Sequence, residues 1–261
     1  MLKSQRQNEI LDILKNENFV TVTELSRRLY SSLPTVRRDL NVLEAEGYIK
    51  RCHGGAMLLA GEENTPIYFR REKNAKEKTM MCRVAAELIS DRDVIFVDAS
   101  STVFHISDFL EEKKEITVVT NSHLAAQRFL ERNMATYCTG GKLLKESFVY
   151  AGYAAETAAS LYNADIMFFS AASLSDDGMI SDWSDEERSM RAVMNKSAKI
   201  SVFMCDSSKI GKVSAFKLFS LDSVDYLITD KPVSDELVER YSMTIKVSEP
   251  ACLYKIGTHV K

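Results

Sequence analysis

The chain has 261 residues, of which 45% are hydrophobic and 27% charged, and its formal net charge is -3 at pH 7. This length can bury a full core and suits one small and one larger domain, and the sequence has no internal repeat or low-complexity tract. Residues 1–58 carry nine Lys or Arg against seven Asp or Glu, and the remainder carries 25 against 30. We therefore expect a mildly basic head and an acidic body.

The cysteines and histidines show no pattern typical of a metal or disulfide site. The five cysteines include no CxxC pair, and their odd number argues against a disulfide framework. The four histidines lack the spacing of metal ligands, so we predict no metal and no cofactor, in a reducing compartment. The longest apolar stretch, residues 166–174, is too short to span a bilayer, and the amino terminus lacks a signal-peptide layout. These features predict a cytoplasmic protein without membrane contact.

Residues 21–43 predict two short helices around a tight turn. Thr21 and Glu24 fit a capping box at the start of the first helix, in which Leu25 and Leu29 lie one turn apart. Ser32 can cap a second helix that begins near Leu33, because Pro34 then falls in the first turn, where the missing amide proton costs little.

The second helix has distinct apolar and polar faces. Leu33, Val36, Leu40 and Leu43 follow helical spacing and are expected to be buried. A helix upstream, at residues 10–14, and a basic hairpin at residues 50–56 complete a winged helix. In that fold, arginines of the second helix read guanine edges or bind phosphates, and the hairpin follows the backbone. The candidate DNA-binding residues are Thr21, Ser32, Thr35, Arg37, Arg38, Asn41, Lys50, Arg51 and His53. A helical hairpin with a solvated arginine face, used for protein contacts, is the alternative interpretation.

Residues 59–78 are interpreted as a linker that passes into a connecting helix. They hold Gly61 and Pro66, and they end in a charged run from Arg70 to Lys78. We interpret this run as a solvated helical face rather than as contacts to flanking DNA. Residues 1–58 are then the DNA-binding domain, and residues 79–261 form the second domain.

Helices and short buried strands alternate in the second domain. Apolar runs of strand length lie at residues 94–97, 116–119, 166–169, 200–204 and 226–228, which predicts a mostly parallel sheet covered by helices. Ligands of such sheets bind beyond the carboxyl ends of the strands, and four polar loops stand there. Hydroxyls and amides at helix starts suit an anion, although Ser, Thr and Asn also cap helices for structural reasons. The loops supply Asp98, Ser100, Ser101, Thr102, Thr120, Asn121, Ser122, Gly140, Gly141, Lys142, Asp206 and Lys209 as candidates.

Two enzymatic motifs are absent. Before Gly141 and Lys142, a nucleotide-binding P-loop would need a glycine where Thr136 stands, and after them it would need Ser or Thr where Leu143 stands. The chain also lacks a GxSxG nucleophile elbow. Kinase, ATPase and hydrolase functions are therefore not supported, and we predict no catalytic residue.

The segments RQNEILDILKNENFVTVTELSRRL and LPTVRRDLNVLEAEGYIKRCHGGAML resemble the DNA-binding head of the DeoR family of bacterial repressors of sugar metabolism. The turn carries Ser31 where members usually have an apolar residue. Later segments match in order, so the resemblance covers nearly the whole chain. It implies an α/β fold class: a small amino-terminal winged helix-turn-helix domain, then a mostly parallel α/β domain of the ribose-5-phosphate isomerase and glucosamine-6-phosphate deaminase type.

The resemblance also implies an effector site for phosphorylated sugars. Ser100, Ser101 and Thr102 would hold the phosphate, with Asn121, Gly141, Lys142 and Lys209 around the sugar and with Asp98 orienting the loop or accepting a hydroxyl. The stretch SDWSDEERSMRAVM adds Glu187 and Arg191. Members usually show a glycine where this chain has Ser100, and the sequence GADG where it has Ser170-Ala171-Ala172-Ser173. Because serine adopts positive φ poorly, we expect a reshaped pocket with altered effector choice or affinity.

Three functional classes remain open. The first is a repressor that binds operator DNA as a homo-oligomer, dimer or tetramer, and is released by a phosphorylated sugar. The second is a sugar-phosphate isomerase or deaminase with a DNA-binding head, which needs a positioned carboxylate; Glu187 is the obvious one, since Ala172 stands where many relatives are polar. The third is a DNA-binding oligomer whose body serves only assembly.

Overall fold

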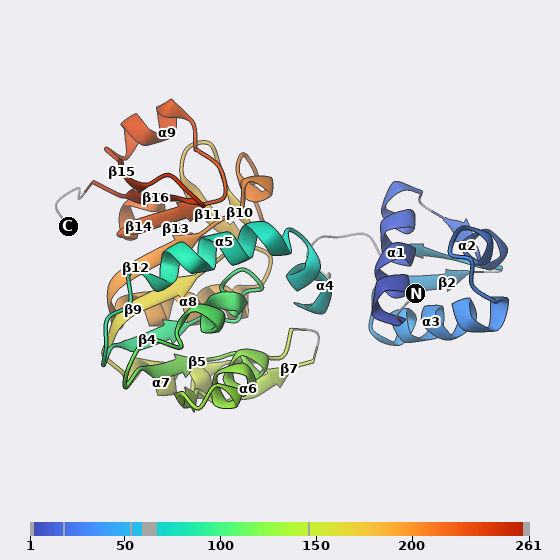
Figure 1. The fold of residues 1–261 in the computed structure, drawn as a ribbon, viewed down its shortest axis with the longest axis horizontal. Helices are drawn as coiled ribbons and strands as arrows, with labels where there is room; N and C mark the ends of the chain where they lie inside the picture. The colour runs from blue at the N-terminus through green and yellow to red at the C-terminus, as the bar shows by residue number, and fades with distance from the viewer. Residues whose placement is uncertain (1–2, 18, 53, 59–66, 146, 258–261) are drawn as a thin grey trace. The chain divides into compact units, whose positions relative to one another are not determined.

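A computed structural model describes residues 3–17, 19–52, 54–58, 67–145 and 147–257 (Figure 1). The chain divides into two compact units, Met1–Arg70 and Arg71–Lys261. No helix in the described part of the chain is long and apolar enough to cross a membrane.

The first unit is a winged helix. It contains α1 (Lys3–Asn16), β1 (Val20–Thr21), α2 (Val22–Arg28), α3 (Leu33–Ala45), β2 (Ile49–Cys52) and β3 (Gly55–Leu58). The strands form an antiparallel sheet in the order β1-β3-β2. Ile10 and Leu14 of α1, Leu25 of α2, and Leu40 and Leu43 of α3 are fully or almost fully buried in one core.

Two predicted caps begin the central helices of this unit. The Thr21 hydroxyl accepts a hydrogen bond from the Glu24 amide at 3.1 Å, and the Ser32 hydroxyl accepts one from the Thr35 amide at 3.4 Å. The prediction that Leu33 is buried was wrong, because its side chain is 39% exposed. Leu33 is the first residue of α3, and the buried stripe of that helix starts one turn later, at Val36.

Glycines close the wing. Gly54 has a φ of +78°, a conformation that favours glycine, and a Cβ on Gly55 would meet the carbonyl oxygen of Val20 at 2.4 Å. Gly55 pairs with Thr21 across β3 and β1, so this close approach holds the wing against the start of α2.

The second unit contains an eight-stranded sheet. Its order is β15-β16-β14-β12-β9-β4-β5-β6, and the six strands from β14 to β6 run parallel to one another. The strands are β4 (Val94–Val97), β5 (Thr117–Thr120), β6 (Ala135–Cys138), β9 (Ala164–Phe169), β12 (Ala198–Met204), β14 (Tyr226–Thr229), β15 (Thr244–Val247) and β16 (Cys252–Lys255). The five predicted strands all occur; β6, β15 and β16 were not predicted, and β6 is short, with three of its four residues exposed.

Helices cover both faces of this sheet (Figure 1). One face packs with α5 (Ala75–Ala86), η2 (Val103–Phe109) and α6 (His123–Glu131), and the other with α7 (Tyr153–Ser160), α8 (Asp185–Lys196) and α9 (Asp235–Arg240). Ile95 and Val97 of β4 pack on the face covered by α5, η2 and α6, and Phe96 packs on the opposite face, as expected for a strand covered on both sides.

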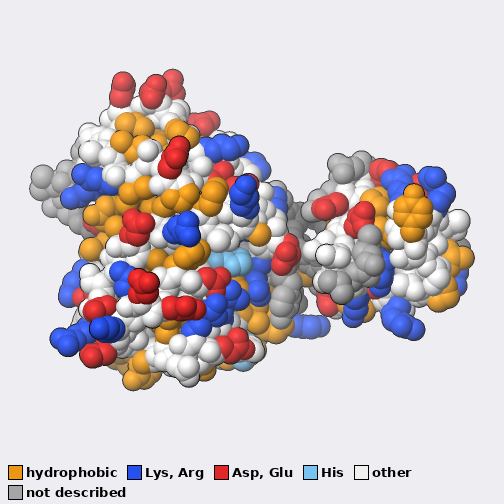
Figure 2. Space-filling view, viewed as in Figure 1, with side chains coloured by type: hydrophobic (Ala, Val, Ile, Leu, Met, Phe, Trp, Pro, Cys, Tyr) orange, Lys and Arg blue, Asp and Glu red, His pale blue; other side chains and the backbone are white. Residues whose placement is uncertain are grey.

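Shorter elements surround the sheet. They are α4 (Ile67–Glu72), the hairpin of β7 (Lys142–Leu144) and β8 (Val149–Ala151), η3 (Ser207–Lys209), η4 (Leu221–Ser223), and a second sheet of β10 (Ser173–Leu174), β11 (Met179–Asp182) and β13 (Phe216–Ser220). Acidic and basic side chains are interspersed over the body in the view of Figure 2. On this face, the body therefore presents small groups of charge rather than a broad surface of one sign.

Candidate functional site

Two arginines of α3 face solvent without a protein partner. Arg37 and Arg38 are exposed, and no hydrogen bond or ion pair joins them to another residue of the described chain. The arginines of α2 differ, since Arg27 and Arg28 both donate to the carboxylate of Glu24. These hydrogen bonds lower the pKa of the Glu24 carboxyl to about 2. The donors of α3 are thus available to an outside acceptor, whereas those of α2 are already engaged.

The other head candidates have mixed roles. The hydroxyls of Thr21 and Ser32 accept the capping amides, and the Thr35 hydroxyl lies 2.8 Å from that of Ser32. Arg51 of the wing is tied to α3, because its guanidinium donates to Asn41 Oδ1 and its amide donates to Glu44 at 2.9 Å. Lys50 is exposed on the wing, and His53 lies outside the described residues. This wing is anchored to the helix whose arginines face outward.

The loops after four adjacent strands of the body meet at one edge of the sheet. The strand order β12-β9-β4-β5 brings together the residues that follow each strand, at positions 205, 170, 98 and 121. Asp98, Asn121 and Asp206 are at most 3% exposed, and Ser170 is fully buried. The predicted convergence of polar residues at this edge is therefore present.

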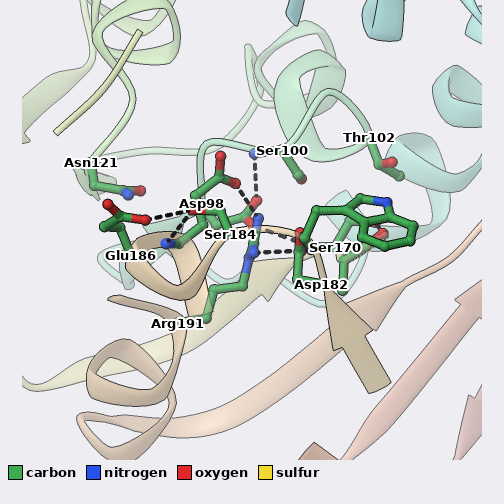
Figure 3. Close-up of polar contacts among 12 residues, drawn as sticks. Asp98, Ser100, Thr102, Asn121, Ser170, Asp182, Ser184, Glu186 and Arg191 are labelled. Atoms are coloured by element: carbon green, nitrogen blue, oxygen red, sulfur yellow. Dashed lines mark hydrogen bonds and ion pairs between the residues drawn. The ribbon is translucent and has the colours of Figure 1, made fainter. Parts of the chain in front are cut away.

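Arg191 of α8 is the centre of a buried ion cluster (Figure 3). Its Nε donates to Asp98 at 2.8 Å, and its two terminal nitrogens donate to Asp182 at 2.7 Å and to Glu187 at 2.9 Å. Burial alone would lower the pKa of this guanidinium, but the three carboxylates outweigh that effect and raise the pKa above its usual value. Asp98 also accepts the amide of Ser100 at 3.0 Å, so it orients the loop after β4. The cluster holds three anionic groups on one cation.

A second cluster contains two lysines and three hydroxyls. Lys209 Nζ donates to Ser170 Oγ at 2.9 Å and to Thr102 Oγ1 at 3.2 Å, while Lys78 Nζ donates to Ser101 Oγ at 3.2 Å. We call these five residues the lysine–hydroxyl cluster. Cationic amines and neutral hydroxyls at the carboxyl edge of a parallel sheet provide donors for an anion.

Asp206, which lies in the loop after β12, supports this cluster. Its carboxylate lies 3.9 Å from Lys209 Nζ and accepts a hydrogen bond from Asn74 at 3.0 Å. Burial would raise the pKa of Asp206, but Lys209 and the hydrogen bonds from Ser208 and Asn74 lower it overall. The carboxylate of Asp206 is thus held in its charged form beside Lys209.

The loop after β5 contributes one unpaired acceptor. Thr120 Oγ1 accepts the Ser122 amide at 3.0 Å, and Ser122 Oγ caps α6 through the Ala125 amide at 3.2 Å. Asn121 Nδ2 donates to the Tyr150 carbonyl at 3.4 Å, but its buried Oδ1 has no hydrogen-bond partner in the described structure. A ligand with a hydroxyl or amine can supply the missing donor.

Gly140, Gly141 and Lys142 follow β6, and no hydrogen bond or ion pair between described residues joins them to the two clusters. Both glycines have positive φ, and a Cβ on Gly141 would meet the Ala151 carbonyl oxygen at 2.9 Å, so they shape the turn into β7. Lys142 is exposed, and no contact joins it to the effector candidates among the residues described. Among all the residues that the structure describes, no group of three His, Cys, Asp or Glu side chains is arranged to hold a metal ion.

Sequence reasoning missed three members of the site. Lys78 was placed in a solvated run, but it is 3% exposed and bonded to Ser101, so that interpretation was wrong for this lysine. Asp182 lies in the quoted stretch before α8, and Ser170 was noted only as a departure from glycine. The one available signal was the helical spacing of Lys78 from Met81, Cys82 and Ala85, which are buried on α5.

Family models match both parts of the chain. A model of the DeoR-like helix-turn-helix domain matches residues 6–61, and one of the DeoR C terminal sensor domain matches residues 73–231. The chain belongs to the DeoR family. The predicted class, a DNA-binding transcriptional regulator, and the predicted fold class of a winged helix followed by a mostly parallel α/β domain are confirmed.

DeoR-type regulators from several organisms are similar along most of their length. The HTH-type transcriptional regulator GolR of Listeria innocua is 31% identical over 95% of this chain and 100% of its own, and the HTH-type transcriptional repressor GlcR of Bacillus subtilis is 33% identical over 95% and 98%. The glycerol-3-phosphate regulon repressor of Escherichia coli is 28% identical over 89% and 92%. A ribose 5-phosphate isomerase A from Methanocaldococcus jannaschii aligns with 72% of this chain and 82% of its own, with 13% identity and a TM-score of 0.40.

The serines at DeoR glycine positions cause no backbone strain. Ser100, Ser170 and Ser173 all lie outside the positive-φ region, so the expected conflict between serine and positive φ does not arise. Ser100 Oγ instead accepts the Val103 amide at 3.3 Å, and Ser170 Oγ holds Lys209. These serines add side-chain contacts to the site.

Proposed function

We propose that this regulator represses transcription from operator DNA and is released when a phosphorylated sugar binds the body. The lysine–hydroxyl cluster carries this proposal, because the buried Lys78 and the partly buried Lys209 direct ammonium groups at the loop that precedes η2. A phosphate accepts stronger hydrogen bonds from lysine than a neutral hydroxyl does. The names of two relatives, a repressor and a glycerol-3-phosphate regulon repressor, support the same function.

The positions of the two clusters support one orientation of the bound effector. Its phosphate is proposed to bind Ser101, Thr102, Lys78 and Lys209, and its hydroxyls to meet acceptors on the other side of Asp98, including Glu187 and the unpaired Asn121 Oδ1. Ser100, Thr120, Ser122, Asp206 and Arg191 hold these groups in place, and Gly140, Gly141 and Lys142 lie at the margin. A ligand that is anionic at one end and rich in donors at the other matches this arrangement.

On the DNA side, Arg37 and Arg38 are proposed to contact base edges and phosphates, with Lys50 and Arg51 on the adjacent backbone. A homo-oligomer, dimer or tetramer, would present two heads to a two-fold symmetric operator, and effector binding would change the affinity of the pair. Binding to chromosomal DNA places the protein in the cytoplasm. We propose no catalytic step, and an assay for ketose formation from aldose phosphates is expected to show no turnover.

The test is thermal unfolding of the full chain with a panel of sugar phosphates and their unphosphorylated parents. One phosphorylated sugar is expected to raise the midpoint while its parent does not, because a ligand of the folded state stabilises it by mass action. Lys209→Met should weaken this effector by about 10- to 100-fold, since a hydrogen bond to a charged group is lost. Lys199→Met is the control, because Lys199 is an exposed lysine paired with Asp165. The absence of any shift across the panel would favour a body that serves only assembly.

A further inference from the structure

The helix that follows the proposed phosphate loop carries a buried aromatic ring between two arginines from different elements. Phe104 lies in the first turn of η2, two residues after Thr102, and is 6% exposed. The guanidinium carbon of Arg71 lies 3.6 Å from the ring centroid, and that of Arg128 lies 4.8 Å from it. Arg71 belongs to α4 and Arg128 to α6. Both contacts are within the distance at which a cation is attracted to an aromatic face.

The two arginines are held differently. Arg128 also donates to Ser107 at 3.0 Å and to Asp108 at 2.7 Å, so α6 is tied to η2 by several polar contacts. Arg71 is the first residue of the body unit, and Arg70 before it belongs to the head unit. The contact of Arg71 with Phe104 therefore attaches η2 to the point where the chain passes from one unit to the other.

The proposed phosphate loop is also bonded to α5, the helix that continues from α4. Lys78 of α5 donates to Ser101, and the thiol of Cys82 donates to the Thr102 carbonyl at 3.1 Å. A bound phosphate would compete with Ser101 for Lys78 and with Thr102 for Lys209, because an anionic oxygen is the stronger acceptor. Effector binding thus changes the contacts on both sides of the residues that lead into Phe104.

We infer that the contact between Arg71 and Phe104 is the coupling element of this regulator: it transmits the occupancy of the phosphate loop, through η2, to the segment that leads to the DNA-binding head. The inference rests on the proposed function. We assign Arg71 a positioning role, because it acts through its contact with Phe104. Coupling of this kind requires that the effector bind two arrangements of the element with different affinity.

The test separates binding from coupling. Full-length wild type, Arg71→Ala and Phe104→Leu are compared with Arg83→Ala, which removes a similar arginine, 5.8 Å from the ring of Phe109, on α5 instead of α4. The probes are the phosphorylated sugar that shifts the wild-type midpoint and an operator fragment selected in vitro with the wild type. In the wild type and Arg83→Ala, we expect the effector to lower DNA affinity by about 10-fold or more, within the usual range of coupling.

In Arg71→Ala and Phe104→Leu, we expect the effector still to raise the unfolding midpoint. Adding the effector should, however, lower the DNA affinity of these variants by less than about 2-fold. Arg71→Lys, which retains a cation, should restore part of the response. Release of DNA from both variants at the wild-type effector concentration would overturn the inference, as would loss of effector binding in both. A wild type that responds to no sugar phosphate would instead contradict the proposed function.

Discussion

The two arginines of α3 and the arginine of the body site are in opposite states. Arg37 and Arg38 project from α3 with no protein acceptor in the described residues, whereas all three donor nitrogens of Arg191 that we describe are bonded to carboxylates. Lys209 and Lys78 resemble Arg191 in this respect, since Lys209 is bonded to two hydroxyls and Lys78 to one. One region leaves its donors open, and the other engages them internally.

This difference indicates how each region responds to its ligand. DNA can add phosphate contacts to α3 without breaking a contact inside the protein, so the head needs no rearrangement of these side chains to bind. An effector must displace hydroxyls from lysines in the body, so its binding changes internal contacts. A site that is already satisfied in the absence of ligand is the one suited to report the ligand's arrival.

Removing the most strongly engaged arginine should have the largest effect. Arg191→Ala leaves the buried carboxylates of Asp98, Asp182 and Glu187 without their cation, and we expect the free energy of unfolding to fall by about 3–5 kcal/mol. The control is Arg188→Ala, three residues earlier on α8, whose partly exposed pair with Asp185 should contribute less than about 1 kcal/mol. Urea unfolding measures both variants. Equal stability of the two would show that the buried cluster does not hold the body together.

Removing the open arginines should affect DNA binding and leave stability nearly unchanged. Arg37→Ala and Arg38→Ala are each expected to weaken operator binding, and the residue that reads a base should lose about 1–3 kcal/mol of discrimination at one position. The residue that contacts phosphate should instead reduce the slope of affinity against salt by about one. Arg27→Ala is the matched control, because Arg27 is exposed but paired with Glu24. Titrations over several salt concentrations and mutated operators distinguish the two roles, and unchanged binding in both variants would refute the assignment of α3.

The same contrast explains what the sequence could predict. The open residues of α3 were predictable, because caps at Ser32 and buried spacing at Val36 and Leu40 fix which face of one helix turns outward. Five strands of the sheet were predictable for a similar reason, since segments such as residues 94–97 and 166–169 are continuous apolar runs.

The engaged residues were harder to predict because their partners are distant in sequence. Lys78 and Ser101 are 23 positions apart, and Arg191 and Asp98 are 93 apart. Local spacing indicates a face of a helix or the end of a strand, but pairing across the sheet is set by the order β12-β9-β4-β5. The polar loops could therefore be predicted to converge, whereas which lysine meets which hydroxyl could not.

The smallest expected effect concerns His105, a further internally held group of η2. Its Nε2 is buried with no hydrogen-bond partner in the part of the chain that we describe. Burial lowers the pKa of this imidazole, and the nearby cations Arg128, Arg71 and Lys78 lower it further, while Asp108, 3.7 Å from Nδ1, opposes them. Near neutral pH the contact with Asp108 is therefore one of a neutral imidazole and not a full ion pair.

The sign of the resulting pH dependence follows from where the proton binds. An unfolded chain takes up a proton on His105 near pH ~6.5, whereas the folded chain does so only at lower pH, so the unfolded state gains protons first as the pH falls. The contribution of His105 to stability is complete above about pH 6.5 and is lost as the pH falls below that value. Between pH 7 and pH 5, His105→Asn should lose less unfolding free energy than the wild type. The exposed His123 gives the matched control, and His123→Asn is expected to keep the wild-type dependence. A steeper fall in His105→Asn than in the wild type would mean that folding stabilises the charged imidazole. The folded body would then accommodate the positive charge of His105 in addition to those of Arg71 and Arg128 beside Phe104.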